Sequence, residues 1–317
     1  MAPTIKLQIF VGIFFLLVYQ AAEFSSGELA FTVKFRDELS PYRTMSAFVL
    51  PDEILKLEII RGANKGTYLC NVESGTFVTT APTKWQWRAP SDKGLYPITV
   101  ISPTGTDTML LNVFVMVPYK ELDGEYLNSY RIGNYPATPL KQLPIYKPPR
   151  GFIEVTNDNQ DTYVSPHFKL KQFLCKQAGD YPKYIVLRER LLLKLELILA
   201  KVNDEGYKCE TFHVMSGYRT PYYNKLIKDV KYSRHVWGGA ADIFIDENPA
   251  DGMMDDLDKN GVIDYRDAKV LYDIVDNIYG KPWYERFIGG LGQYEKTANH
   301  GPFVHIDVRG FRARWGK

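Results

Sequence analysis

The chain has too few cysteines, too widely spaced, for a cysteine-based metal site. Among 317 residues there are three cysteines, Cys70, Cys175 and Cys209, and no Cys-x-x-Cys pair. A zinc site built from such pairs is therefore excluded. Cys175 and Cys209 lie in the same half of the chain and would pair in an oxidising compartment, with Cys70 left over. Three free thiols are the alternative, and the sequence leaves both open.

An excess of one charge is also missing. The 39 Lys and Arg residues nearly balance the 37 Asp and Glu residues, and the formal net charge is +2. Because this balance does not demand a polyanion, we expect no nucleic-acid partner. There is no internal repeat and no low-complexity tract, so a repeat architecture is not expected. The length and the 45% of hydrophobic residues suit two domains with sizeable cores.

The N-terminus carries a long apolar run. Lys6 precedes LQIFVGIFFLLVYQAA, which extends from Leu7 to Ala22. A basic residue before such a run is typical of a secretory signal peptide, and the run is short for a membrane-spanning helix, which needs about 20 apolar residues. The residues after it give an ambiguous cleavage site. Residues 1–27 are therefore interpreted as a signal peptide or as an anchor in the inner membrane. Either way we expect the remainder to be exported to the periplasm or cell envelope.

Residues 28–118 have the pattern of an all-β domain. They contain short alternating runs, such as AFTVKF, LYPITVI and TMLLNVFVMV, and turn sequences between them, such as SPTGTD and RGANKG. In WQWRAPSDKGLYPITV an aromatic strand, a turn and a second strand follow one another, which favours an immunoglobulin-like β-sandwich without the Cys-Trp-Cys framework. No catalytic constellation occurs here, so we expect a spacer or binding module.

Residues 119–165 form a Pro- and Tyr-rich connector. Five prolines in YRIGNYPATPLKQLPIYKPPRGF oppose regular structure and favour extended backbone. The aromatic and apolar residues of this stretch are too many for a solvated linker. We therefore expect the connector to pack on one of its neighbours.

Residues 166–317 have an α+β pattern. We expect a short helix in HFKLKQFLCKQ, a long helix in LRERLLLKLELILAKVNDEGY with a glycine near its end, and a helix in DAKVLYDIVDNIY. Three short β-like runs each contain or end in polar groups: ETFHVMSGYRT, RHVWGGAADIFID and GPFVHIDVRG. The candidate chemistry of the chain lies in these three runs.

The stretch SRHVWGGAAD, residues 233–242, predicts part of a metal site. Its two glycines permit a tight bend that would bring the side chains of His235 and Asp242 together. Asp242 opens a hydrophobic strand, where an unpaired carboxylate is costly. His305 in FVHIDVRG can supply a third ligand. Two histidines and one carboxylate with an open fourth position make a catalytic zinc set.

Three segments, SGYRTPYYN, SRHVWGGAAD and GGLGQY…GPFVHIDVRG, resemble in this order the zinc D-Ala-D-Ala carboxypeptidase and murein endopeptidase family. The resemblance covers roughly residues 166–315. It implies a hedgehog/DD-peptidase-like zinc domain in an exported metallopeptidase, an endopeptidase or D,D-carboxypeptidase that hydrolyses stem-peptide bonds of peptidoglycan with metal-activated water. It also implies that His235, Asp242 and His305 bind zinc, and that Arg219 binds substrate or stabilises the oxyanion.

The chain departs from the better-known members of that family beside the last zinc ligand. They place a glutamate three residues, or a histidine two residues, before that histidine, where this chain has Pro302 and Phe303. A general base is still needed. Asp307 shares a strand face with His305 and could reach the water or orient the ligand, and His300 lies in a loop that could swing in. The gap leaves an alternative open: a non-catalytic peptidoglycan-binding or scaffold protein with a structural zinc.

A second metal site is expected in DLDKNGVIDYRD, residues 256–267. In an EF-hand loop, oxygen ligands occupy positions 1, 3, 5, 7, 9 and 12, with glycine at position 6, and Gly261 is at that position here. The ligands would be Asp256, Asp258, Asn260, the carbonyl of Val262, Asp264 and Asp267. We expect a structural Ca²⁺ loop, inserted at about residues 250–270 between the second and third zinc ligands. An acidic turn that binds nothing is the alternative.

Overall fold

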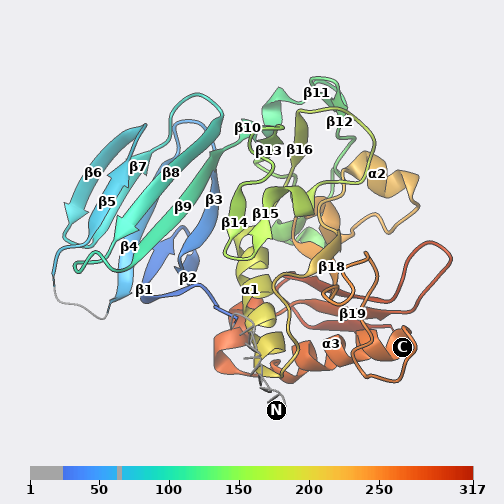
Figure 1. The fold of residues 1–317 in the computed structure, drawn as a ribbon. Coiled ribbons are helices and arrows are strands. Elements are labelled where there is room, and N and C mark those ends of the chain that lie inside the picture. The colour runs from blue at the N-terminus through green and yellow to red at the C-terminus, as the bar shows by residue number, and fades with distance from the viewer. Residues whose placement is uncertain (1–23, 63–65, 317) are drawn as a thin grey trace, which may run out of the picture.

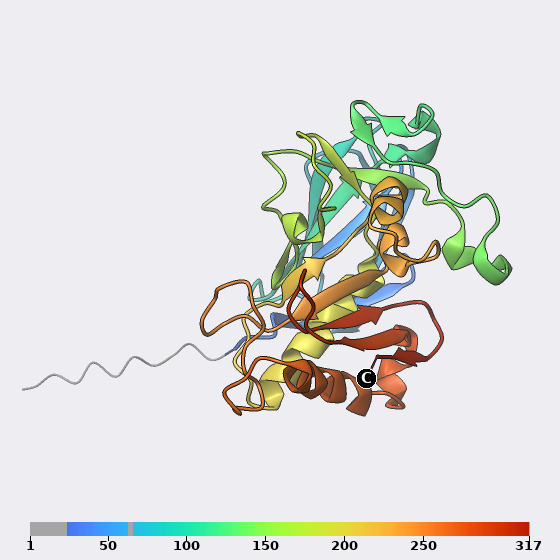
Figure 2. The ribbon, with the colours of Figure 1, turned by 90° about the vertical axis from the view of Figure 1, so that its right-hand side faces the viewer.

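The computed structural model describes residues 24–62 and 66–316 (Figures 1 and 2). The chain has a mixed α+β fold, in which a β-rich N-terminal half is followed by a mixed sheet with helices. The expected signal peptide or anchor lies, apart from residues 24–27, outside the described residues. Within the described ranges, no helix has the length and hydrophobicity that a membrane crossing requires.

Two sheets form the N-terminal half. One has the order β2-β1-β4-β7-β6 and is antiparallel; the other has the order β3-β9-β8-β5, in which only the pair β3–β9 is parallel. The bounds are β1 Glu28–Phe35, β2 Glu38–Tyr42, β3 Thr44–Val49, β4 Ile54–Gly62, β5 Leu69–Val72, β6 Thr76–Ala81, β7 Lys84–Arg88, β8 Gly94–Ile101 and β9 Thr108–Val115. This part of the chain is all-β, as expected.

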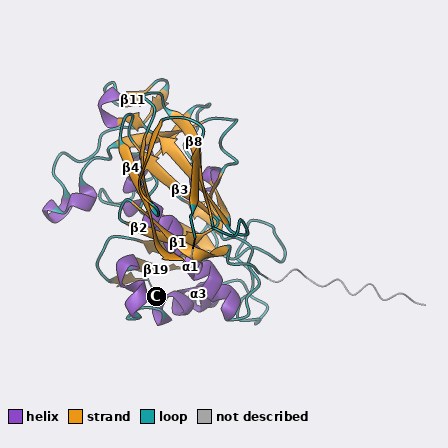
Figure 3. Ribbon diagram, turned by 90° about the vertical axis from the view of Figure 1, so that its left-hand side faces the viewer, coloured by secondary structure: helices purple, strands orange, loops and turns teal. Residues whose placement is uncertain are grey.

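The alternation of side chains explains why the two sheets pack against each other (Figure 3). In β1, Phe31, Val33 and Phe35 are buried while the residues between them are less so. Strands expose alternate residues on opposite faces, so such a pattern produces one apolar face per sheet. The ring of Trp87 in β7 lies 6.4 Å from that of Tyr96 in β8, across the two sheets.

The connector packs on both halves rather than on one. Asn112 of β9 donates to the Tyr163 carbonyl, while Trp237 of the C-terminal half donates to the Lys147 carbonyl. Tyr135 also bonds across to the C-terminal half, through the Val236 carbonyl. The regular elements of the connector region are short: β10 Val117–Pro118, η1 Tyr119–Glu121, β11 Tyr126–Leu127, β12 Tyr130–Arg131, η2 Leu140–Gln142, η3 Pro144–Tyr146, β13 Gly151–Val155 and β14 Tyr163–Ser165.

The C-terminal half is built on a five-stranded sheet of order β17-β18-β20-β19-β21, in which only β19 and β21 run parallel. Its strands are β17 His213–Ser216, β18 Ala240–Phe244, β19 Gly290–Tyr294, β20 Phe303–Asp307 and β21 Ala313–Trp315. A further strand, β16 (Lys183–Ile185), pairs with β13 of the connector. The helix α3 (Tyr265–Asn277) contacts β19 and β20, so one face of the sheet is covered and the other is left for a site.

Two of the three expected helices are confirmed. The long one is α1 (Glu189–Asp204), followed by Gly206 at φ +89°, and the second is α3. The short helix expected in residues 167–177 is wrong: the segment forms β15 (Phe168–Lys169) and a 3₁₀ turn. Leu170 and Phe173 are buried at a spacing of three, which suits 3₁₀ geometry. The remaining elements are η4 Leu170–Phe173, α2 Pro221–Leu226, η5 Arg234–Trp237 and η6 Pro282–Phe287.

The disulfide alternative for Cys175 and Cys209 is overturned, because all three cysteines are free thiols. Cys175 lies against Gln177, while Cys209 donates to the Thr211 carbonyl. Burial raises the pKa of each of these thiols, so they stay protonated and behave as small apolar groups.

A buried ion pair ties the start of the described chain to α1. The His167 ring lies 2.6 Å from a carboxylate oxygen of Glu196, which is almost fully buried, and 3.0 Å from the Ser25 carbonyl. Burial alone would lower the pKa of His167, but the hydrogen bond and charge of Glu196 outweigh it and raise the pKa. A raised folded-state pKa means that the stabilisation is complete at acid pH and is lost as pH rises through that pKa.

We expect His167→Gln to lower the free energy of unfolding by about 1 kcal/mol more near pH 5.5 than near pH 8.5, because only the protonated imidazole pairs with Glu196. Urea unfolding of both proteins at the two pH values measures this difference. An equal loss of unfolding free energy at both pH values would contradict the ion pair.

Candidate metal centre

Strand register places the polar groups of the site in one row across the C-terminal sheet. Asp242 of β18 pairs with His305 of β20, which in turn pairs with Gly292 of β19. The row continues at both ends, with Ser216 of β17 beside Asp242 and Trp315 of β21 beside Gly292. Because paired residues share a face, these groups all lie on the side of the sheet away from α3.

The third ligand arrives from a bend rather than from a strand. His235 lies in η5, and Gly238 ends that turn in the left-handed region at φ +61°. A side chain at Gly238 would lie 2.1 Å from the Val186 carbonyl oxygen, so only glycine fits. The bend returns the chain into β18 and holds His235 over Asp242, as the sequence predicts.

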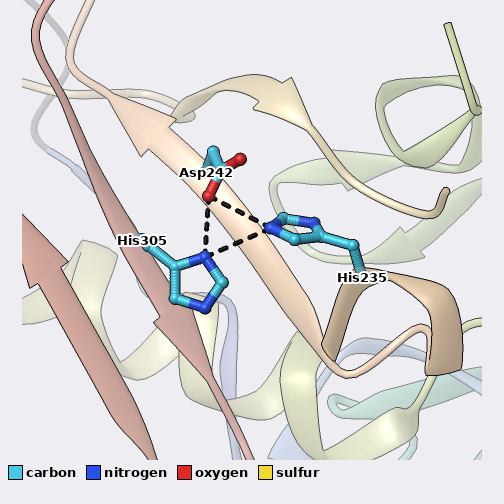
Figure 4. Close-up of side chains that lie close together, drawn as sticks. All are labelled: His235, Asp242 and His305. Carbon is cyan, nitrogen blue, oxygen red and sulfur yellow. Dashed lines mark hydrogen bonds and ion pairs between the residues drawn. The ribbon is translucent and has the colours of Figure 1, made fainter. Parts of the chain in front are cut away.

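The three side chains converge on one point (Figure 4). Oδ1 of Asp242 lies 3.1 Å from Nε2 of His235 and 2.8 Å from Nδ1 of His305, and the two nitrogens are 3.1 Å apart. All three residues are buried. A tetrahedral zinc ion about 2.0–2.1 Å from each atom keeps its ligand atoms roughly 3.3 Å apart. The arrangement therefore accommodates such an ion with a movement of a few tenths of an ångström.

The outer partners of these groups leave the inward atoms free to hold a cation. Nδ1 of His235 lies 2.7 Å from the Gly217 carbonyl, and Nε2 of His305 lies 3.2 Å from Asp307. Both partners are acceptors, so each outer ring nitrogen carries a proton, and each neutral ring turns its lone pair inward. Two lone pairs and a carboxylate oxygen then face one another in a buried place. Such a donor set, with supporting contacts on its outer atoms, could hold a metal ion.

The pKa shifts of Asp242, His235 and His305 in the absence of a metal ion also indicate that the centre favours a positive charge. Burial would raise the pKa of Asp242, but His235 and His305 hold it well below its usual range. Burial lowers the pKa of His235, whereas the hydrogen bonds that the His305 ring donates to Asp242 and Asp307 raise the pKa of His305 despite its burial. Without a metal ion, a proton on His305 is thus the charge that relieves the repulsion, and metal ions must compete with it.

Arg219 lies beside the centre and supports a ligand. Its Nη2 donates to Oδ2 of Asp242 at 2.6 Å, its Nη1 to Asp229 at 2.7 Å and its Nε to Ser216 at 2.8 Å. The guanidinium therefore balances the charge of Asp242 and fixes which oxygen points inward.

The structure separates the two residues that the sequence offered as the general base. Asp307 is fully buried and pairs with Arg309 as well as His305. Of the two roles expected for it, reaching the water or orienting the ligand His305, its position suits the second. The hydrogen bonds from those two partners outweigh burial and lower its pKa, which weakens it as a base. His300 contacts the Gly301 carbonyl and the Phe303 ring and does not line the cleft above the centre.

A cleft of about 590 Å³ opens above the three ligands. Its wall includes Phe303 and further aromatic and charged side chains that the sequence did not indicate as site residues: Tyr146, Asp229, Lys231, Tyr232, Tyr294, Arg309 and Trp315. They come from the connector, the loop after α2 and the sheet edge, and only the register of distant strands brings them together. A glycine in mid-strand, Gly292, is a sequence signal that could have indicated a close approach there.

The acidic loop is brought together in part. Carboxylate oxygens of Asp256, Asp258 and Asp267 lie within 4.8 Å of one another. Asp256 accepts hydrogen bonds from the backbone of Asn260 and Gly261, and Gly261 has φ +84°. Three of the expected carboxylates could thus hold an ion.

Asp264 has a capping role in this structure. It caps α3, accepting from the backbone of Arg266, and is not part of the three-carboxylate group. Asp267 completes a capping box with the Asp264 backbone, so it has a structural role whether or not an ion is bound.

No family model matches this chain, and no curated protein matches it either. The resemblance described above therefore rests on the quoted motifs.

We expect the isolated protein to bind about one zinc ion at this centre, and His235→Ala or His305→Ala to abolish that binding, because two remaining ligands hold zinc poorly. Arg219→Ala should keep the site but lower its zinc affinity about 10–100-fold. Zinc titration after removal of metal with a chelator measures each constant.

His300→Ala is the matched control, since it also deletes an imidazole but one outside the centre. Its zinc affinity should equal that of the wild type. Zinc retained at full affinity by His235→Ala would refute the centre.

At the acidic loop, we expect Ca²⁺ at about 100 times its dissociation constant to raise the melting temperature by roughly 5 °C, because the ion binds the folded loop. Asp258→Ala should remove this increase, whereas Asp273→Ala, an exposed acid on α3, should keep it. Calorimetric scans with and without Ca²⁺ decide; an increase that survives in Asp258→Ala would indicate binding elsewhere.

Proposed function

We propose that the protein is an exported zinc metallopeptidase that hydrolyses stem-peptide bonds of peptidoglycan, as an endopeptidase or D,D-carboxypeptidase. The observation that carries the proposal is the convergence of two inward lone pairs and one carboxylate at the base of an open cleft. A structural zinc site is normally closed by four protein ligands, whereas three ligands and a free position are typical of a catalytic one. Among the described residues this group has three members.

The cleft has the chemistry to hold a peptide with acidic groups. Aromatic rings of Tyr232, Phe303 and Trp315 offer apolar walls, and Lys231 is exposed without an ion-pair partner among the described residues. Stem peptides carry carboxylates, which such a cation can bind. On this proposal, the C-terminal half is a hedgehog/DD-peptidase-like domain and the N-terminal half an immunoglobulin-like sandwich.

The mechanism assigns each residue of the centre a separate task. His235, Asp242 and His305 would hold zinc, which when bound activates water and polarises the peptide carbonyl. Arg219 and Asp307 keep the inward atoms of two ligands in place. The walls of the cleft fix the peptide so that its carbonyl meets the open position.

A proton acceptor must also stand in the cleft. Among the described residues that line it, Asp229 is the carboxylate that is not a ligand, and it is partly exposed. Its Oδ2 accepts from Arg219 and its Oδ1 from the backbone of Val230. Each oxygen keeps a lone pair, so we propose that Asp229 takes the proton of the attacking water and passes it to the leaving amine.

We expect zinc-loaded protein to release peptide products from cross-linked muropeptides, and expect chelation or His235→Ala to abolish release. Asp229→Asn should keep zinc and lower the rate about 10²–10⁴-fold, the usual contribution of a general base. Chromatography of the digests, beside zinc content, measures both.

The rival function is a peptidoglycan-binding or scaffold protein with a structural zinc. Tight sacculus binding by zinc-loaded wild type, with no product formed, would favour it and refute the peptidase. Product formed at the same rate in the chelated protein would refute the role of the metal.

A further inference from the structure

We propose that Tyr294 is a catalytic residue, whose hydroxyl donates a hydrogen bond to the substrate oxygen that becomes negative when water adds to the peptide carbonyl. This inference rests on the proposed peptidase function and deepens it. It assigns the oxyanion contact to the last residue of the segment GGLGQY, for which the resemblance implies no role.

The first step is the state of Arg219, the residue that those motifs offer for the same contact. Each of its three guanidinium nitrogens already donates to a side-chain oxygen, of Ser216, Asp229 or Asp242. Two of these acceptors are carboxylates, and one is a ligand of the centre. Turning Arg219 toward substrate would break its charge-assisted hydrogen bonds to Asp229 and to the buried Asp242, which is costly. Arg219 is therefore better described as a positioning residue.

The second step is the position of Tyr294 on the sheet. It is the last residue of β19 and lies two residues beyond Gly292, which pairs with His305. Residues two apart on a strand share a face, so the side chain of Tyr294 projects on the side of the zinc ligands. Its ring stacks on that of Phe303 at 4.4 Å, and both line the cleft.

The third step is the contact that fixes the hydroxyl. Nε1 of Trp315 donates to the Tyr294 hydroxyl oxygen at 2.8 Å, and the indole lies 5.1 Å from the ring of His305. Gly292 makes this possible, since a side chain there would lie 2.3 Å from Nε1 of Trp315. The tryptophan thus bridges the tyrosine and a ligand of the centre.

The fourth step is an account of protons. Because the indole N–H is a donor only, the Tyr294 oxygen must accept in that contact, and its own O–H needs another acceptor. None of the described residues accepts from it. The hydroxyl is thus a fixed donor on the cleft wall with its hydrogen free to meet a ligand oxygen.

The chemistry that follows conserves every proton. The oxygen of water adds to the carbonyl carbon, the π pair moves to the carbonyl oxygen, and Asp229 takes the proton of water. Tyr294 keeps its own proton and only donates a hydrogen bond to the new oxyanion. When the carbon–nitrogen bond breaks, the electron pair returns from the oxyanion and the amine receives the proton from Asp229.

The test compares Tyr294→Phe with Tyr232→Phe. Tyr232 lines the same cleft, but its hydroxyl already donates to the Thr138 carbonyl at 3.0 Å, so its removal tests loss of a phenol oxygen alone. The probes are zinc content, muropeptide hydrolysis, and the affinity of zinc-loaded protein for two small ligands. These are a phosphinate analogue of D-Ala-D-Ala, which carries the tetrahedral anion, and N-acetyl-D-Ala-D-Ala itself.

For Tyr294→Phe we expect full zinc content, kcat about 10²-fold lower with KM nearly unchanged, and phosphinate affinity at least about 10-fold lower with unchanged affinity for the dipeptide. Tyr232→Phe should keep full zinc content, and any loss of affinity that it causes should fall equally on the phosphinate and on the dipeptide, because Tyr232 belongs to the wall that holds the peptide. Unchanged kcat and phosphinate affinity in Tyr294→Phe, or equal losses in both variants, would overturn the assignment.

If wild-type protein hydrolyses no muropeptide, the proposed function fails, and the phosphinate arm alone decides the role of Tyr294. A selective loss of phosphinate affinity then still supports an anion-facing hydroxyl, and no loss overturns it.

Discussion

The C-terminal half depends on one constraint: three buried hydrogen-bond acceptors, which repel one another, are held close together. Two imidazole nitrogens and a carboxylate oxygen lie within 3.1 Å of one another. They stay there because each has an outer partner: the Gly217 carbonyl, Asp307 or Arg219. Without a cation or a proton between them, the low dielectric of the interior would drive them apart. The surrounding fold therefore holds the three groups in an arrangement that favours the binding of a positive charge.

The rest of the molecule holds that cluster from several sides. The connector, whose aromatic and apolar residues predict that it packs on a neighbour, lies beside the metal motif, where Tyr135 meets Val236 and Lys147 meets Trp237. At the other end, α1 touches the N-terminal strands β2 and β3 as well as α3. Glu38 of β2 accepts from Arg190 of α1 and from Arg286. The two halves thus meet through fixed polar contacts rather than through a solvated tether.

The sequence predicted what depends on local pattern and missed what depends on register. The period of buried leucines marked α1, and the glycine bend with its flanking His235 and Asp242 marked the centre before the strands were known. Leu170 and Phe173 follow a spacing that a 3₁₀ turn satisfies as well as an α-helix, so that segment was misread. Asp229, Tyr294 and Trp315 have no local signature, because only the pairing of β19 with β20 and β21 brings two of them to His305.

The row of paired residues across the C-terminal sheet carries one more consequence. Ser216, Asp242, His305, Gly292 and Trp315 sit on a single line only when four separate strand pairings are in phase. A slip of one residue at any of them would turn its member toward the helices on the far side. The pairing of β18 with β20 is the one that aligns two of the candidate ligands, Asp242 and His305. A bound ion would therefore stabilise only chains in which these two strands are in register.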